Sequence, residues 1–187
     1  MNLPNKLTLL RVLLIPVFMF FASWSVGNTG VLVAGIIFAA ASFTDFLDGF
    51  LARKNHMVTD FGKFADPLAD KLLTTVAFIY MMADGVCSPI VICIIIAREF
   101  AVSGVRMIAA SSPEGKVIAA NIWGKLKTVL QMLTVIFYYF AMGIFGGANA
   151  AFVQGASSLL CWLVAIVTAL SGIQYIWGNR HFINTAK

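Results

Sequence analysis

Long apolar segments separated by short polar ones make up most of this chain. A helix that spans a bilayer needs about 20 apolar residues, so the chain has room for roughly six such helices. The apolar segments cover residues 13–24, 31–52, 62–82, 89–110, 121–145 and 152–177. The pattern predicts an all-α integral membrane protein with six transmembrane helices.

The composition supports this interpretation. Hydrophobic residues make up 60% of the 187 residues and charged residues 11%, whereas soluble domains carry about 25% charged residues. We expect one membrane domain over residues 1–187, with a short segment, 1–10, along the membrane surface. The net charge of +5 could indicate nucleic-acid binding. The bases form no run or stripe, however, and instead flank the apolar segments.

The positions of the bases predict the orientation. Cytoplasmic loops of membrane proteins are enriched in Lys and Arg. Every base lies in or nearer to the N-terminus, the second-to-third connection, the fourth-to-fifth connection or the C-terminus. Six spans with both termini in the cytoplasm satisfy this distribution, with the remaining three connections on the opposite side.

Four aspartates at the cytoplasmic ends of the second and third spans are the strongest sign of chemistry. Asp45 and Asp48 are three residues apart and Asp66 and Asp70 four apart, so each pair shares a face of its predicted helix. Carboxylates in such an apolar setting cost free energy unless cations accompany them. Oxygen ligands favour Mg²⁺, Mn²⁺ or Ca²⁺ over zinc or copper. We therefore expect a site for hard divalent cations.

The residues between these aspartates suit a phosphate-bearing substrate. Gly49 and Gly62 have no Cβ, so a ligand or the facing helix can approach the backbone closely there. Arg53 can bind a phosphate oxygen through its planar guanidinium. Together with the carboxylates, these residues indicate a phosphoryl-transfer site. The alternative is that the aspartates are buried partners of nearby bases, namely Arg53, Lys54, Lys63 and Lys71, which leaves the glycines unexplained.

The stretch Asp-x-x-Asp-Gly-x-x-Ala-Arg, eight residues, then Gly-x-x-x-Asp-x-x-x-Asp, over 45–70, resembles the signature motif of the CDP-alcohol phosphotransferase family. The resemblance implies transfer of a phosphatidyl group from a CDP-activated lipid to an alcohol, with release of CMP. It implies two Mg²⁺ or Mn²⁺ ions and a homodimer. It further implies that Asp45, Asp48, Asp66 and Asp70 hold the metals, that Asp70 is also the base, and that the CDP-diacylglycerol site includes Asp45, Gly49, Ala52, Arg53 and Gly62.

Sequence beyond the motif bears on the acceptor alcohol. The stretches 2–11, 69–74, 96–106 and 124–132 resemble bacterial family members that use glycerol 3-phosphate. An anionic acceptor also requires cations, which Arg98, Arg106, Lys125 and Lys127 can supply. Alternatively, Lys125 and Lys127 extend to the interface as anchors. Arg98 could instead pair with Glu99 or with one of the aspartates.

Two rival functions follow from the same residues. Intramembrane carboxylates also occur in cation-coupled transporters, although transport sites lie near the bilayer midplane and these aspartates lie toward the cytoplasmic end. A related enzyme with another acceptor, such as inositol phosphate, serine or phosphatidylglycerol, is the second alternative. Whichever acceptor the enzyme uses, we expect it to lie in the bacterial cytoplasmic membrane with an active site that faces the cytosol.

Overall fold

The computed structural model describes residues 3–24, 27–54, 60–111 and 122–180, with the side chains of 3–5, 27, 45–54, 60–67, 70, 110 and 111 left undescribed. Within these ranges all regular structure is helical, and no strand occurs. The all-α prediction is confirmed. The helices are α1 (Leu3–Ser23), α2 (Gly27–Lys54), α3 (Asp60–Ala83), α4 (Pro89–Ser111), α5 (Ile122–Phe145) and α6 (Ala150–Gly178).

The helix bounds follow the apolar segments closely, with one difference at the N-terminus. Helix α1 begins at Leu3 and continues through Pro16 without a break. Most of the segment 1–10 is therefore the first part of a long helix. Its position along the membrane surface stays a prediction.

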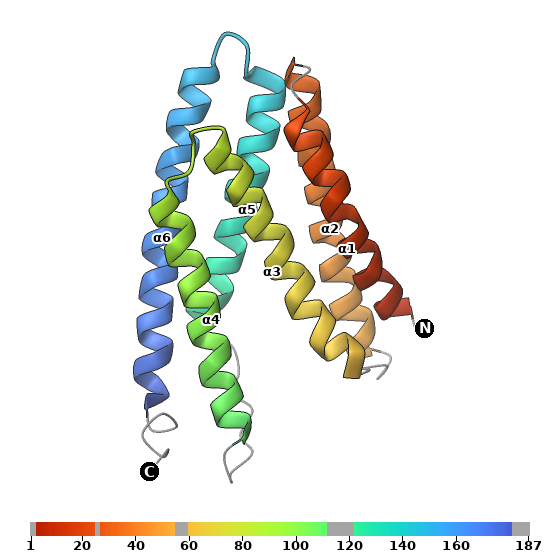
Figure 1. Cartoon of the computed structure of the whole chain (residues 1–187), viewed down its shortest axis with the longest axis vertical. Helices are drawn as coiled ribbons and strands as arrows, with labels where there is room; N and C mark the ends of the chain where they lie inside the picture. The colour runs from red at the N-terminus through yellow and green to blue at the C-terminus, as the bar shows by residue number, and fades with distance from the viewer. Residues whose placement is uncertain (1–2, 25–26, 55–59, 112–121, 181–187) are drawn as a thin grey trace.

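The six helices form an elongated bundle (Figure 1). Helix α1 packs on α2 and α3, α2 on α5, and α6 on both α4 and α5. The start of α1 and the end of α6 lie at the same end of the bundle, where α2 also ends and α3 begins (Figure 1). The end of α1, the start of α2 and the segments that join α3 to α4 and α5 to α6 lie toward the other end (Figure 1).

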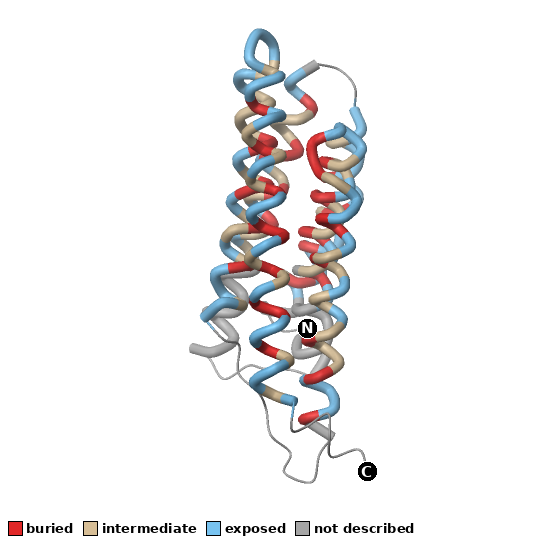
Figure 2. The backbone as a smooth tube through the Cα atoms, turned by 90° about the vertical axis from the view of Figure 1, so that its left-hand side faces the viewer, coloured by how far each residue is buried: buried red, intermediate tan, exposed pale blue. Residues whose placement is uncertain are grey.

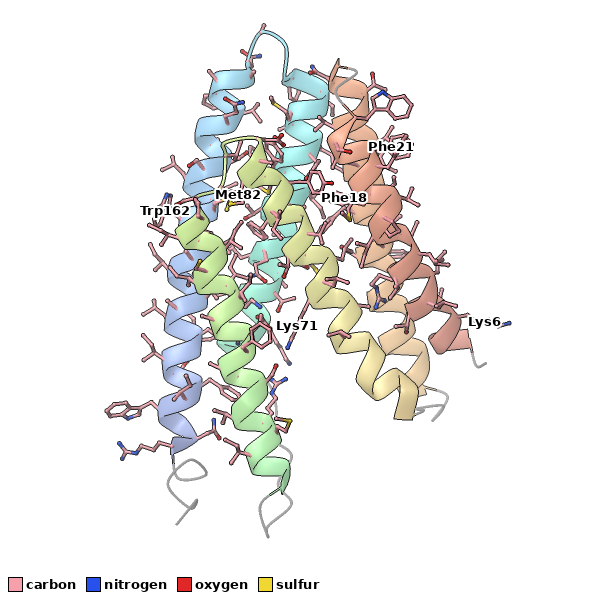
Figure 3. All side chains as sticks on the ribbon, in the orientation of Figure 1. Lys6, Phe18, Phe21, Lys71, Met82 and Trp162 are labelled. Carbon is pink, nitrogen blue, oxygen red and sulfur yellow. The ribbon has the colours of Figure 1, made fainter. Side chains whose placement is uncertain are left out.

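Aromatic side chains form the centre of the main core. The ring of Phe18 lies 6.2 Å from that of Phe38, 6.1 Å from Tyr80 and 5.3 Å from Tyr139. These distances are typical of favourable edge-to-face or tilted pairs. Figure 3 shows Phe18 on the inner side of α1. One cluster of rings therefore joins α1, α2, α3 and α5.

The exterior of the bundle carries large apolar side chains on every helix (Figure 2 shows the exposed positions). Soluble monomers rarely expose contiguous apolar surface of this extent. Within the part of the chain that the structure describes, three stretches are long and apolar enough to cross a membrane: Lys6–Ser23, Ile122–Phe145 and Ala150–Gly178. Both observations are typical of a membrane protein. The most exposed of these side chains include Phe100, Ile122, Phe152, Leu159 and Trp177.

Candidate active site

The four aspartates of the motif lie in two consecutive helices. Asp45 and Asp48 belong to α2, and Asp66 and Asp70 to α3. The expected helical spacing of each pair is thereby confirmed at the backbone. Their side chains lie outside the described part of the structure, and so do the surroundings of the predicted donor-site residues Gly49, Ala52, Arg53 and Gly62.

A cavity of about 430 Å³ lies between α3, α4 and α5. Its described lining includes Lys71, the residue that directly follows the motif in the chain. The described lining carries five cations and one carboxylate, a formal excess of four positive charges. These residues are Lys71, Arg98, Arg106, Lys125, Lys127 and Glu99. All four predicted acceptor-site cations therefore line a single cavity.

Glu99 connects the cations of three helices. One of its carboxylate oxygens pairs with Lys127 of α5 and, at 3.1 Å, with Nη1 of Arg98. Its other oxygen lies 3.4 Å from Nζ of Lys71, which projects from α3 (Figure 3) and donates a 2.7 Å hydrogen bond to Ser103. Breaking such a buried pair from one side is costly, because the remaining charge loses its partner. Glu99 therefore fixes the cations at the cavity wall.

Arg98 is held from α6 as well. Its Nη2 donates a 3.1 Å hydrogen bond to Ser171 Oγ. A Cβ on Gly172 would lie 2.9 Å from Arg98 Cγ, and a Cβ on Gly124 would lie 3.3 Å from Nη2. The Arg98 side chain thus passes between α5 and α6 at positions that have no side chain, and it is 10% exposed.

Arg106 lies two turns further along α4 and is exposed. Its Nε donates a 3.1 Å hydrogen bond to the Tyr175 hydroxyl, and its guanidinium lies 5.5 Å from the centre of that ring. Lys125, near the start of α5, is also exposed. Both residues lie toward the end of the bundle where the motif lies, so they form the outer part of the cavity.

The structure decides two of the open alternatives. The pairing of Arg98 with Glu99 is confirmed. The alternative that Lys127 is an interface anchor is wrong, because its side chain is 6% exposed and paired with Glu99. Lys125 stays open between the two roles. Lys71 pairs with Glu99, so its interaction with the aspartates is not required to satisfy its charge.

Several contacts of the structure are not predicted from the sequence. The sequence predicts Glu99 only as a possible partner of Arg98, and it predicts no role for Ser171 or Tyr175. Arg11 precedes the apolar segment 13–24 that is expected to form the first span, yet it is fully buried and its Nε donates a 3.4 Å hydrogen bond to the Ala41 carbonyl of α2. The available signal was the presence of charges inside apolar segments, because such charges usually face the interior of a bundle.

A second cavity of about 390 Å³ lies beside the first, between α3 and α4. It shares Lys71, Thr75 and Glu99 with the basic cavity. The rest of its lining is mostly apolar and includes Leu68, Leu72, Ile96 and Phe100. A charged cavity and an apolar one thus have a common wall.

This arrangement defines a class: a helical membrane-type protein with a positively charged cavity next to an acidic motif, suited to an anionic substrate with an apolar part. Residues 1–171 match the family of CDP-alcohol phosphatidyltransferases. The chain belongs to that family. Membership of this family favours a transferase over a cation-coupled transporter as the function of the chain.

Bacterial relatives match over most of their length. A protein of Bacillus subtilis (strain 168) is 39% identical, with 100% of this chain and 99% of that protein covered. A protein of Rickettsia typhi is 35% identical over 93% of this chain and 94% of its own length. One of Escherichia coli (strain K12) is 33% identical, with 96% and 95% covered. All three are named CDP-diacylglycerol–glycerol-3-phosphate 3-phosphatidyltransferase.

Proposed function

We propose that this enzyme transfers the phosphatidyl group of CDP-diacylglycerol to glycerol 3-phosphate, with release of CMP and formation of phosphatidylglycerophosphate. The observation that carries the proposal is the basic cavity beside the motif, in a chain whose relatives are named for this reaction. An acceptor with a phosphate of its own suits a cavity whose described lining carries four excess positive charges. Serine and other acceptors without a phosphate group do not require so many.

The reaction is an in-line displacement at phosphorus. A hydroxyl oxygen of glycerol 3-phosphate forms a bond to the phosphatidyl phosphorus, and the bond from that phosphorus to the CMP oxygen breaks. Asp70 accepts the proton of the attacking hydroxyl, the role of a general base. Residues 66, 70 and 74 follow at intervals of four along α3, and Thr74 lines the cavity. This spacing supports a base next to the acceptor.

The donor set of the motif fits hard divalent cations. Asp45, Asp48, Asp66 and Asp70 offer only carboxylate oxygens, which are the ligands that Mg²⁺ and Mn²⁺ prefer. Among the residues whose side chains are described, no group of three or more His, Cys, Asp or Glu forms a competing site. Two bound ions would neutralise the pyrophosphate of the donor and polarise the attacked phosphorus.

The two substrates enter different parts of the site in this proposal. Gly49, Ala52, Arg53 and Gly62, with Asp45, bind the CMP part of the donor, and the apolar cavity between α3 and α4 suits a lipid chain. The acceptor phosphate binds at the cations of the basic cavity. We assign it to Arg106, Lys125, Lys127 and Arg98.

We infer that all six helices span the bacterial cytoplasmic membrane, with both termini and the motif on the cytosolic side. The placement of the first and last helix ends at one end of the bundle supports an even number of spans (Figure 1). The chain is one membrane domain in this proposal, and it works as a homodimer.

The test is CMP release by the purified protein with CDP-diacylglycerol and a panel of alcohols. We expect release with glycerol 3-phosphate and little with inositol phosphate, serine or phosphatidylglycerol. Release that requires a different alcohol would assign the chain to a related activity of the same family.

A further inference from the structure

We propose that Gln131 binds the acceptor alcohol, with its side-chain amide donating a hydrogen bond to an oxygen of that substrate. The inference rests on the proposed function and adds a specificity-determining residue to its acceptor site. Gln131 lies in α5 and lines the basic cavity.

The side-chain nitrogen of Gln131 is buried without a hydrogen-bond partner among the described residues. The residue is 3% exposed, and its Nε2 has no hydrogen-bond partner in the described part of the chain. Buried polar groups in proteins are nearly always hydrogen-bonded, since an unpaired donor keeps its full desolvation cost. A second buried donor of the same cavity, Arg98 Nε, is also unpaired among the described residues. Two such donors in one cavity indicate a ligand with acceptor oxygens.

The position of Gln131 indicates which part of the cavity it serves. Gly124, Lys127 and Gln131 follow one another at intervals of three and four on α5, so they share one face. Gln131 is one turn beyond Lys127, about 6 Å along the helix. The amide therefore lies past the ion pairs of Glu99, at the end of the cavity away from Lys125.

A neutral amide at this place suits an oxygen of a small polyol phosphate. It can donate to a phosphate oxygen, or both donate to and accept from a hydroxyl. Glycerol 3-phosphate has one hydroxyl that does not react. An analogue with a hydrogen atom in its place carries the same charge, so charge alone does not select against the analogue. The Gln131 amide does select against it, because the amide is left without a hydrogen-bond partner when that hydroxyl is missing.

The test is steady-state kinetics of full-length Gln131→Leu, which keeps the size and removes the polar atoms. We expect kcat/KM for glycerol 3-phosphate to fall about 10- to 100-fold, the loss typical of one such hydrogen bond. The KM for CDP-diacylglycerol should stay unchanged. The thermal midpoint of unfolding of Gln131→Leu should equal or exceed that of the wild type, because the substitution removes a buried hydrogen-bond donor that has no partner among the described residues. Gln131→Met is the second variant if the first does not fold.

The control and an analogue separate the possible results. Ser157→Ala removes a buried hydroxyl on α6 that is likewise unpaired among described residues but does not line the cavity, so its kinetics should match the wild type. With 1,3-propanediol phosphate, which lacks the unreactive hydroxyl, equal kcat/KM for variant and wild type would assign the bond to that hydroxyl. A persistent loss would assign it to the phosphate.

A lowered thermal midpoint with unchanged kinetics in Gln131→Leu would overturn the inference and make Gln131 a packing residue. In that case the wild type still uses glycerol 3-phosphate, and the proposed function stands. A wild type that does not use glycerol 3-phosphate refutes both.

Discussion

At the scale of single residues, the described part of the site is organised by one carboxylate. Glu99 pairs with Lys71, Arg98 and Lys127 from three helices. The side chains of Glu99, Arg98 and Lys127 are largely withdrawn from water, whereas that of Lys71 is 37% exposed. Charges in such surroundings keep their positions because moving one exposes another without a partner. The cavity wall is therefore formed before the substrate arrives, which lowers the entropy cost of binding.

The motif aspartates give the first prediction at this scale. Asp70→Asn keeps the shape but removes the base, so turnover should fall by about 10²–10⁴. Near wild-type turnover of Asp70→Asn would require another base.

A chelator tests the metal site separately. EDTA should abolish CMP release by the wild type, and Mg²⁺ or Mn²⁺ should restore it. Full activity in EDTA would contradict the metal site.

Arg106 gives the second prediction at the scale of single residues. Arg106→Ala should raise the KM for glycerol 3-phosphate far more than that for CDP-diacylglycerol, because it removes binding common to ground and transition states. The expected cost is about 1.5–3 kcal/mol, or one to two orders of magnitude in kcat/KM. Kinetics with each substrate varied separately measure it.

Two further variants make this result specific. Arg106→Lys should recover only part of the loss, since Lys lacks the planar fork. Tyr175→Phe removes the hydroxyl that accepts from Arg106 Nε and should have a smaller effect. A defect confined to CDP-diacylglycerol would move Arg106 to the donor and leave the acceptor to Lys125 and Lys127.

At the scale of elements, the helices could be read from the sequence and their mutual packing could not. Apolar length locates α4 to within a residue, because a span needs a fixed number of apolar residues. Nothing in that pattern tells which helix supplies the partner of a given charge. Ser171 is 73 residues from Arg98 in the chain and reaches it only because α4 packs on α6. Gln131 likewise gave no signal, since one polar residue in an apolar segment fits many roles.

The contact between α4 and α6 yields an element-scale prediction. Gly172→Ala would place a Cβ 2.9 Å from Arg98 Cγ, near the base of the side chain, so either the arginine or the helix must move. We expect a destabilisation of about 1–3 kcal/mol and a raised KM for glycerol 3-phosphate. Gly155→Ala on the same helix meets nothing within 4 Å and should be neutral or stabilising. Equal behaviour of the two variants would contradict the close seating of Arg98.

At the scale of the whole molecule, apolar side chains cover the outside while charges line an interior cavity. This distribution, together with the family, explains how one protein can bring a lipid and a water-soluble anion together.

The orientation of the helices in the membrane gives a prediction at the same scale. A cysteine at Arg180 should react with an impermeant thiol reagent from the cytosolic side, and one at Asn149 from the opposite side, after replacement of the native cysteines. Labelling of both from one side would refute the six-span topology.

The most direct measurement of the central claim is the fate of labelled glycerol 3-phosphate. Purified protein is incubated with CDP-diacylglycerol, Mg²⁺ and glycerol 3-phosphate labelled in the glycerol, and lipid-bound label and CMP are both quantified. The account predicts one labelled glycerol phosphate in the lipid fraction for each CMP released, and no CMP without the acceptor. CMP release without label in the lipid would show hydrolysis or a different acceptor and would contradict the account.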